Sequence, residues 1–401
     1  MTAGRPLEGF RILDFCWIGA GALVTKTLAE LGASVYRVES RSHPDNLRLS
    51  PPFRPGTSGI EASGYFASRN SSKRSIALNM ATEEGRALAL DLAQRVDMVS
   101  SNFRPGIMER WDMSYPQLRE KNAGLIYLTM PMQGADGPHS RYIGFGSTIA
   151  ALSGLVALSG VPGRAPVGTG THFPDHVPNP GHALVAVLAA IRHLRRTGQG
   201  QEIELSQLES TVNVLGPAVV EAGLGQTSQL VGNRVSDAAP HGAYRCSDGS
   251  WAVISCRSDE QWSSLTAALG IAAPAGLAGL AARKEAEASV DALVADAVAR
   301  FDRDALLRVL DAAGVPSAPV NSSRDIVEEK VLWERGFWRD IEHPVIGRIP
   351  INRSPFRLID GPQADVTRPP LLGEDTEAVL QTELGLGRDE LDRLTEAKVL
   401  Y

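Results

Sequence analysis

The first forty residues alternate between apolar runs and an amphipathic segment, and this alternation limits the fold more than any other feature. FRILDF (residues 10–15) is a short apolar run followed by glycines. ALVTKTLAELG (22–32) has helical spacing and ends at Gly32, a residue type that favours helix ends. SVYRVES (34–40) is a second apolar run. A strand, a helix and a strand in this order predict the α/β class, with a parallel sheet covered by helices.

The same alternation continues through the next part of the chain. Further strands are expected at 74–80 and 124–130 and in EIELS, which begins at Glu202. An amphipathic helix capped by Thr82 is expected over 82–96, because Thr82 precedes two acids and acids there suit the positive end of a helix. ALVAVLAAIRHLRR (183–196) is nearly all apolar until its last turn, which predicts a buried helix.

The character of the sequence changes near Gly225. The following residues are rich in loops and end in two apolar runs around SDGS, which is typical of a hairpin. Helices are expected at 259–269 and 284–310. The predicted domains are a large domain over 1–224, a small inserted α+β domain over 225–320, and a C-terminal part, 321–401, that returns to the large domain.

Composition excludes several classes of protein and ligand. The chain has 401 residues and a net charge of −6, so we expect no nucleic-acid partner. Three cysteines are too few for a disulfide framework and are typical of a reducing compartment. The chain has no signal-peptide core and no apolar run near the roughly 20 residues that a membrane span needs. We therefore expect a cytoplasmic protein with no membrane partner.

The loop between the first strand and the first helix contains Gly19 and Gly21. Val24 stands where a dinucleotide fingerprint has its third glycine, and Glu39 lies near the position of a ribose-binding acid. A nicotinamide oxidoreductase is an alternative that rests on this loop alone.

Asp175 stands in a loop rich in His and Pro, just before the apolar helix. The residues alone leave two interpretations open: the carboxylate caps the helix, as Asp commonly does, or it is a nucleophile. His172 and His176 are spaced as zinc ligands on one face of a helix would be. Pro174 and Pro178 interrupt this segment, so no metal site is predicted.

Nine segments resemble, in order, the class III coenzyme A transferases, the family of formyl-CoA transferase, carnitine CoA-transferase and α-methylacyl-CoA racemase. The segments are PLEGFRILDF, LAELGASVYRVES, SSKRSIALNM, NFRPGIMERW, ALSGLVALSG, RRTGQGQEIELSQLES, AAPHGAYRCSDG, GVPSAPV and PPLLGEDTEAVL. Together they cover essentially the whole chain, and the ordered set is highly specific.

The resemblance implies a fold and an assembly. It implies a Rossmann-like large domain whose parallel sheet is formed from both chain ends, and a small inserted α+β domain. It also implies an interlocked homodimer in which each chain threads through the other. Some family members work as pairs in which one chain lacks the catalytic aspartate, so a paralogous partner subunit is an alternative.

The resemblance further implies that Asp175 is the catalytic nucleophile. Attack of its carboxylate on an acyl-CoA would give a mixed anhydride, and the returning thiolate would give an aspartyl-CoA thioester. The energy of the thioester bond is conserved, so no metal and no tightly bound cofactor are expected. Coenzyme A enters as the acyl-CoA substrate, with succinyl-CoA as the candidate donor and a small carboxylic acid as the acceptor.

Positions that contact CoA in the family match two basic clusters and the glycine loop. Guanidinium groups bind phosphate bidentately, and Phe103 offers an apolar cover for adenine or pantetheine. Ser40 stands where formyl-CoA transferase has an Arg, which makes the neighbouring Arg41 a candidate. The predicted CoA contacts are Trp17, Ile18, Gly19, Ala20, Arg41, Lys73, Asn102, Phe103 and Arg104.

The predicted contacts of the acceptor acid are Met132, Phe145, His172 and His176. Methionines at 130 and 132 form an adaptable apolar wall, which indicates an acceptor with an aromatic or bulky aliphatic body. Phe145 aligns with the His that racemases of the family use, and Phe carries no proton, which argues against a racemase or isomerase. A non-catalytic partner subunit is a further alternative, against which the presence of Asp175 argues.

Overall fold

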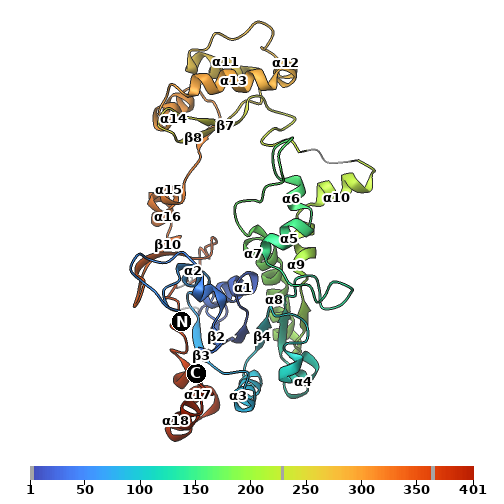
Figure 1. The fold of residues 1–401 in the computed structure, drawn as a ribbon, viewed down its shortest axis with the longest axis vertical. Helices are drawn as coiled ribbons and strands as arrows, with labels where there is room; N and C mark the ends of the chain where they lie inside the picture. Colours follow the sequence, from blue (N-terminus) through green and yellow to red (C-terminus); the bar gives the residue numbers. More distant parts are fainter. Residues whose placement is uncertain (1–3, 227–229, 363–365) are drawn as a thin grey trace. The chain divides into compact units, whose positions relative to one another are not determined.

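The structure is a computed structural model that describes residues 4–226, 230–362 and 366–401. It divides into two compact units (Figure 1). The first comprises Met1–Val156, Gly168–Thr227 and Val331–Tyr401, and the second comprises Ala157–Val167 and Ser228–Lys330. The domain division expected from the sequence stays a prediction. The compact units differ from it in grouping a short segment, Ala157–Val167, with the second unit.

The first unit is built on a six-stranded parallel sheet in the order β3-β2-β1-β4-β5-β6. Its strands are β1 (Arg11–Phe15), β2 (Ser34–Glu39), β3 (Arg74–Ala77), β4 (Met98–Ser101), β5 (Ile126–Thr129) and β6 (Glu202–Glu204). The predicted α/β class and Rossmann-like sheet are confirmed. All six strands of this sheet lie within residues 11–204. The C-terminal segment adds helices and a separate two-stranded sheet to this unit, and it adds no strand to the parallel sheet, although the resemblance implied a sheet formed from both chain ends.

Helices cover both faces of the sheet (Figure 1). Successive strand residues point to opposite faces, so Leu13 enters one core and Ile12 the other. The core around Ile12 is closed by α1 (Ala20–Glu30) and α8 (Pro178–Thr197). The helices over Leu13 are α3 (Glu83–Ala93), α4 (Tyr115–Lys121), α17 (Thr376–Leu384) and α18 (Arg388–Glu396).

Shorter elements fill the connections. They are η1 (Asn46–Leu49), α2 (Gly64–Asn70), η2 (Glu109–Trp111), α5 (Gly146–Leu152), α6 (Leu155–Leu158), α7 (Phe173–His176), α9 (Gln207–Asn213), α10 (Gly216–Gly223), α15 (Ser323–Glu328), α16 (Lys330–Glu334), β10 (Trp338–His343) and β11 (Gly347–Asn352). Thr82 caps α3, since its Oγ1 accepts a hydrogen bond from the Gly85 N–H at 3.0 Å, as the sequence predicts.

The second unit has an antiparallel sheet in the order β7-β8-β9, with helices packed on it. Its elements are β7 (His241–Arg245), β8 (Trp251–Ser255), α11 (Asp259–Leu269), α12 (Leu280–Glu285), α13 (Glu287–Val298), α14 (Arg303–Ala312) and β9 (Ser317–Pro319). The predicted hairpin and the helix at 259–269 are confirmed. The helix expected over 284–310 is broken, because Asp302 starts a new helix by accepting from the Ala305 N–H at 2.8 Å.

The prediction that the apolar segment of α8 is buried is wrong for one face of the helix. Val187 and Ile191 are buried against the sheet, but Val185 is 71% exposed and Leu188 is 42% exposed. The sequence pattern indicates that a helix is apolar, but it does not indicate whether the same chain or another chain covers its apolar face. None of the helices in the described part of the chain combines the length and apolar character that a membrane crossing needs.

Candidate active site

The candidate site lies at the carboxyl ends of β1 and β4, where the strand order reverses. Parallel α/β sheets bind ligands at this point because the loops after the two strands diverge there. The Asn102 side chain joins the two loops. It accepts from the Trp17 N–H at 2.9 Å and donates to the Trp17 carbonyl at 2.6 Å. The structure thus brings together two groups of predicted CoA contacts.

Asp175 is the third residue of α7, and its side chain lies against the backbone of two glycines. A Cβ built on Gly19 would lie 3.0 Å from the Asp175 Cγ, and one built on Gly146 would lie 2.5 Å from its Oδ2. The carboxylate therefore occupies space that any larger residue at position 146 would enter. α8 begins at Pro178 with Val177 as its N-cap, so Asp175 does not cap this helix.

Burial raises the pKa of the Asp175 carboxyl to about 6. The His172 ring, the backbone N–H of Gly146 and the Arg69 guanidinium lower the pKa, because each of them favours the charged form. The carboxylate is therefore mostly ionised at neutral pH and poorly hydrated. A nucleophile in this state has less bound water to lose before it attacks.

Two adjoining cavities extend from Asp175 along the switch point. The first has a volume of about 230 Å³ and is lined by Asp175, Gly146 and the loop after β1. The second has a volume of about 520 Å³ and is walled mainly by apolar side chains, among them Phe15 and Trp111. The residues that line both are Trp17, Asn102, Phe103, Arg104 and Ile143. A long ligand can therefore reach from Asp175 into the apolar cavity.

Phe103 lies between two indole rings at the junction of the cavities. Its ring meets Trp17 edge-on at a centroid distance of 5.3 Å and Trp111 at 5.8 Å. The Trp17 indole is held in turn by a hydrogen bond from its Nε1 to the Val38 carbonyl at 3.1 Å. These contacts fix an aromatic surface suited to stacking with a planar ligand group.

The sequence model of CoA-transferase family III matches residues 7–376. The chain belongs to this family. The alpha subunit of the succinyl-CoA–L-malate CoA-transferase of Chloroflexus aurantiacus is 32% identical over 400 residues, which cover 98% of this chain and 92% of the relative. The succinyl-CoA:mesaconate CoA-transferase of Haloarcula hispanica is 32% identical over 392 residues, covering 95% and 97%. The activity class that the sequence predicts, a CoA-transferase acting on CoA thioesters, is confirmed.

A solved structure agrees with this assignment. The crystal structure of a CAIB/BAIF family protein from Brucella suis superimposes with a TM-score of 0.88 at 30% identity. The match covers 95% of this chain and 100% of that chain. The fold of this family III CoA-transferase is therefore shared along nearly its whole length.

Lys73 lines neither cavity of the transferase. Its ammonium is buried, and it donates to the Asp14 carboxylate at 3.1 Å and to the Asn70 side chain at 3.0 Å. Burial lowers the pKa of Lys73, while the charge of Asp14 opposes this shift. This geometry argues for a structural ion pair and against direct contact with a phosphate.

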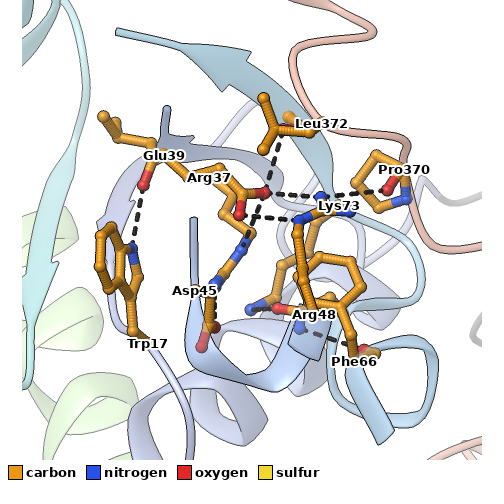
Figure 2. Close-up of polar contacts among 12 residues, drawn as sticks. Trp17, Arg37, Glu39, Asp45, Arg48, Phe66, Lys73, Pro370 and Leu372 are labelled. Atoms are coloured by element: carbon orange, nitrogen blue, oxygen red, sulfur yellow. Dashed lines mark hydrogen bonds and ion pairs between the residues drawn. The ribbon is translucent and has the colours of Figure 1, made fainter. Parts of the chain in front are cut away.

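The Glu39 carboxylate is also bound by another side chain of the protein. Arg48 donates to both of its carboxylate oxygens, at 2.7 and 2.9 Å, and Figure 2 shows the pair beside Arg37. Glu39 is among the residues that line the larger cavity, but its side chain has no solvent exposure and both carboxylate oxygens are bound by Arg48, so it is not free to bind a ribose. The alternative of a nicotinamide site loses its acidic residue. Arg41 is exposed after β2 and lines neither cavity.

The predicted acceptor contacts divide into two groups. Met132 and Phe145 line the smaller cavity with Asp175, whereas His172 and His176 do not. Burial lowers the pKa of His176 to about 4, so its ring is neutral at pH 7. Its Nε2 accepts from Arg69 at 2.7 Å and its Nδ1 lies 3.0 Å from the Thr171 hydroxyl. Both ring nitrogens are therefore engaged with protein groups.

Sequence reasoning missed two residues of the site. Gly146 follows Phe145 in the sequence, and its closeness to Asp175 has no local signal. Arg69 lies in α2, far along the chain from Asp175, although its charge acts on that carboxylate. Within the described ranges, no group of three or more His, Cys, Asp or Glu side chains is arranged to hold a metal ion.

Proposed function

We propose that this enzyme moves coenzyme A from succinyl-CoA to a small carboxylic acid, with Asp175 as the nucleophile. The position of Asp175 carries the proposal: a buried carboxyl with a raised pKa lies against bare glycine backbone, at the end of a cavity that leads to the switch point. Two relatives are named for succinyl-CoA as donor, and their named acceptors, malate and mesaconate, differ. The acceptor is therefore proposed only as a class.

The proposed reaction passes through covalent intermediates on the Asp175 carboxylate. An Asp175 oxygen attacks the succinyl-CoA carbonyl carbon, the C–S bond breaks, and a mixed anhydride and CoA thiolate form. The thiolate attacks the Asp175 Cγ, which releases succinate and leaves an aspartyl-CoA thioester. The acceptor carboxylate then attacks Cγ and displaces the thiolate. The thiolate finally attacks the acceptor's carbonyl carbon, which forms the new acyl-CoA and restores Asp175.

We place CoA along the two cavities. Pantetheine would pass the bare backbone of Gly19, and the adenine would enter the larger cavity against Phe103. Arg104 is exposed and lines both cavities, so its guanidinium is the proposed phosphate ligand. Arg41 stays a predicted phosphate contact, while the buried pair of Lys73 with Asp14 argues against direct phosphate contact by Lys73.

Exposed apolar side chains support the proposal of a homodimer. Val185 of α8 is 71% exposed, and Val220 and Leu224, in and after α10, are 61% and 71% exposed. α10 has no buried residue in the single chain. Apolar helices left uncovered mark protein interfaces, and a second copy of the chain is the proposed cover. Relatives named as alpha and beta subunits make a paralogous partner the alternative.

The decisive experiment uses the purified chain alone. It is incubated with succinyl-CoA and a panel of carboxylic acids, and new thioesters are identified by their mass. We expect transfer to at least one acid, and hydroxylamine treatment during turnover should label Asp175. The variant D175N should fold and make no product. Substantial turnover by D175N, or a peptide map with no label at this position, would contradict the nucleophile.

A further inference from the structure

Ile18 has a strained backbone in the loop between β1 and α1. Its φ is 63°, in the left-handed region that β-branched residues avoid because their side chain crowds the backbone. Such a conformation persists only where the surrounding structure holds it, and it is often found next to functional groups. The following residue, Gly19, lies against the Asp175 carboxylate.

Two buried charged side chains hold the backbone that leads into Ile18. The Ile18 N–H donates to Asp45 Oδ2 at 3.1 Å. The Cys16 carbonyl accepts from Arg37 Nη1 at 2.7 Å. Arg37 lies in β2, and Asp45 is the residue just before η1. The loop is therefore held by side chains from outside β1 and α1.

Arg37 and Asp45 also bind each other. They form an ion pair in which neither side chain has any solvent exposure, and Figure 2 shows Arg37 between Asp45 and Glu39. Burying two charges costs free energy that their attraction offsets only when the remaining donors and acceptors are also used. Here part of that remaining capacity goes to the Cys16 carbonyl and the Ile18 N–H.

We propose that the Arg37–Asp45 pair positions the active site by holding Ile18 in its left-handed conformation. This sets the distance between the Gly19 backbone and the Asp175 carboxylate. Neither Arg37 nor Asp45 lines either cavity, so the pair acts through the loop and not on substrate. The inference rests on the proposed role of Asp175.

The closeness of Gly19 to Asp175 makes this distance sensitive. A Cβ built on Gly19 would lie 3.0 Å from Asp175 Oδ2, so the bare Gly19 backbone is an immediate neighbour of the carboxylate. If Ile18 relaxed to a right-handed conformation, the Gly19 backbone would move relative to the carboxylate. A displacement of about 1 Å at a reacting group can cost roughly 100-fold in rate.

The test is a double-mutant cycle between Asp45→Asn and Ile18→Gly, measured as kcat and KM for succinyl-CoA. D45N should lower kcat roughly 10- to 100-fold with a much smaller change in KM. Glycine adopts positive φ without strain, so the loop of I18G does not need the Arg37–Asp45 pair, which we call the clamp, to hold this conformation. D45N should therefore cost at least about tenfold less in kcat in the I18G background. Equal costs in both backgrounds would overturn the inference.

Controls separate this inference from the proposed function. Glu61→Gln removes a partner of Arg48, 2.6 Å away in the same network, without touching the loop, and should leave kcat near that of the parent. If D45N does not fold, the I18G/D45N double variant is compared with I18G, and a large loss of kcat there overturns the clamp. An active D175N would refute the nucleophile itself, whereas an inactive D175N with an additive cycle refutes only the clamp.

Discussion

The Asp175 carboxyl meets two opposing requirements. The proposed role as a nucleophile needs the ionised form, but the site removes water from the carboxylate and raises its pKa from 3.8 to about 6. The folded state therefore binds this proton more tightly than the unfolded state. Stability falls as pH rises through the window between these two values, and the cost remains at neutral pH.

D175N should therefore be more stable than the parent at pH 7 while losing turnover. A two-unit shift corresponds to roughly 3 kcal/mol, so we expect a gain of about 1–3 kcal/mol in the free energy of unfolding. Denaturant unfolding at pH 7 and at about pH 4 measures it. The gain should shrink at the lower pH, where the folded parent is protonated. A variant no more stable than the parent at pH 7 would contradict the burial argument.

Arg69 should shift the acid limb of the pH–rate profile that Asp175 produces. Its positive charge favours ionised Asp175, and kcat/KM, which reports the free enzyme, should fall as pH drops through about 6 in the parent. Arg69→Gln removes that charge, raises the pKa of Asp175, and should move the acid limb to higher pH by about half a unit to one unit. Arg69→Lys keeps the charge and should move it less. An unmoved limb in R69Q would show that Arg69 does not act on Asp175.

Helices α8 and α10 are apolar helices whose packing is incomplete within the single chain. Each has the apolar sequence of a buried helix, yet the described chain leaves Val185 and Val220 exposed. Such faces acquire a cover only in an assembly.

Val185→Glu should therefore weaken the proposed dimer. Burying an unpaired carboxylate in an apolar interface is unfavourable, so the variant should shift from dimer toward monomer as concentration falls. Light scattering and sedimentation over a range of concentrations measure this. Val345→Glu, in the exposed turn between β10 and β11, is the matched control and should keep the mass of the parent. An unchanged mass for V185E would exclude this helix face from the interface.

The first unit joins chain segments that are far apart in sequence into one substrate path. The proposed nucleophile is residue 175, while the aromatic surface comes from residues 17, 103 and 111. The parallel sheet creates this arrangement because the carboxyl ends of β1 and β4 are neighbours in space.

Arg104→Ala tests whether CoA follows that path. Loss of a charged phosphate contact should raise the KM for succinyl-CoA by about tenfold or more and leave kcat less affected. The dependence of KM on salt should also become shallower, because one screened charge is gone. Arg110→Ala removes an equally exposed arginine that lines neither cavity and should change KM little. Equal effects of the two substitutions would contradict the proposed phosphate site.

The local pattern of the sequence by itself determined the alternation of strands and helices, the parallel class of the sheet and the cap at Thr82, because these depend on neighbouring residues. The ordered resemblance determined the family and singled out Asp175. Tertiary structure alone decided that Lys73 pairs with Asp14, that Asn102 holds Trp17, and which face of α8 is covered. Those contacts join distant parts of the chain. Periodicity and propensity depend on neighbouring residues, so they carry no information about which distant side chain contacts a given residue.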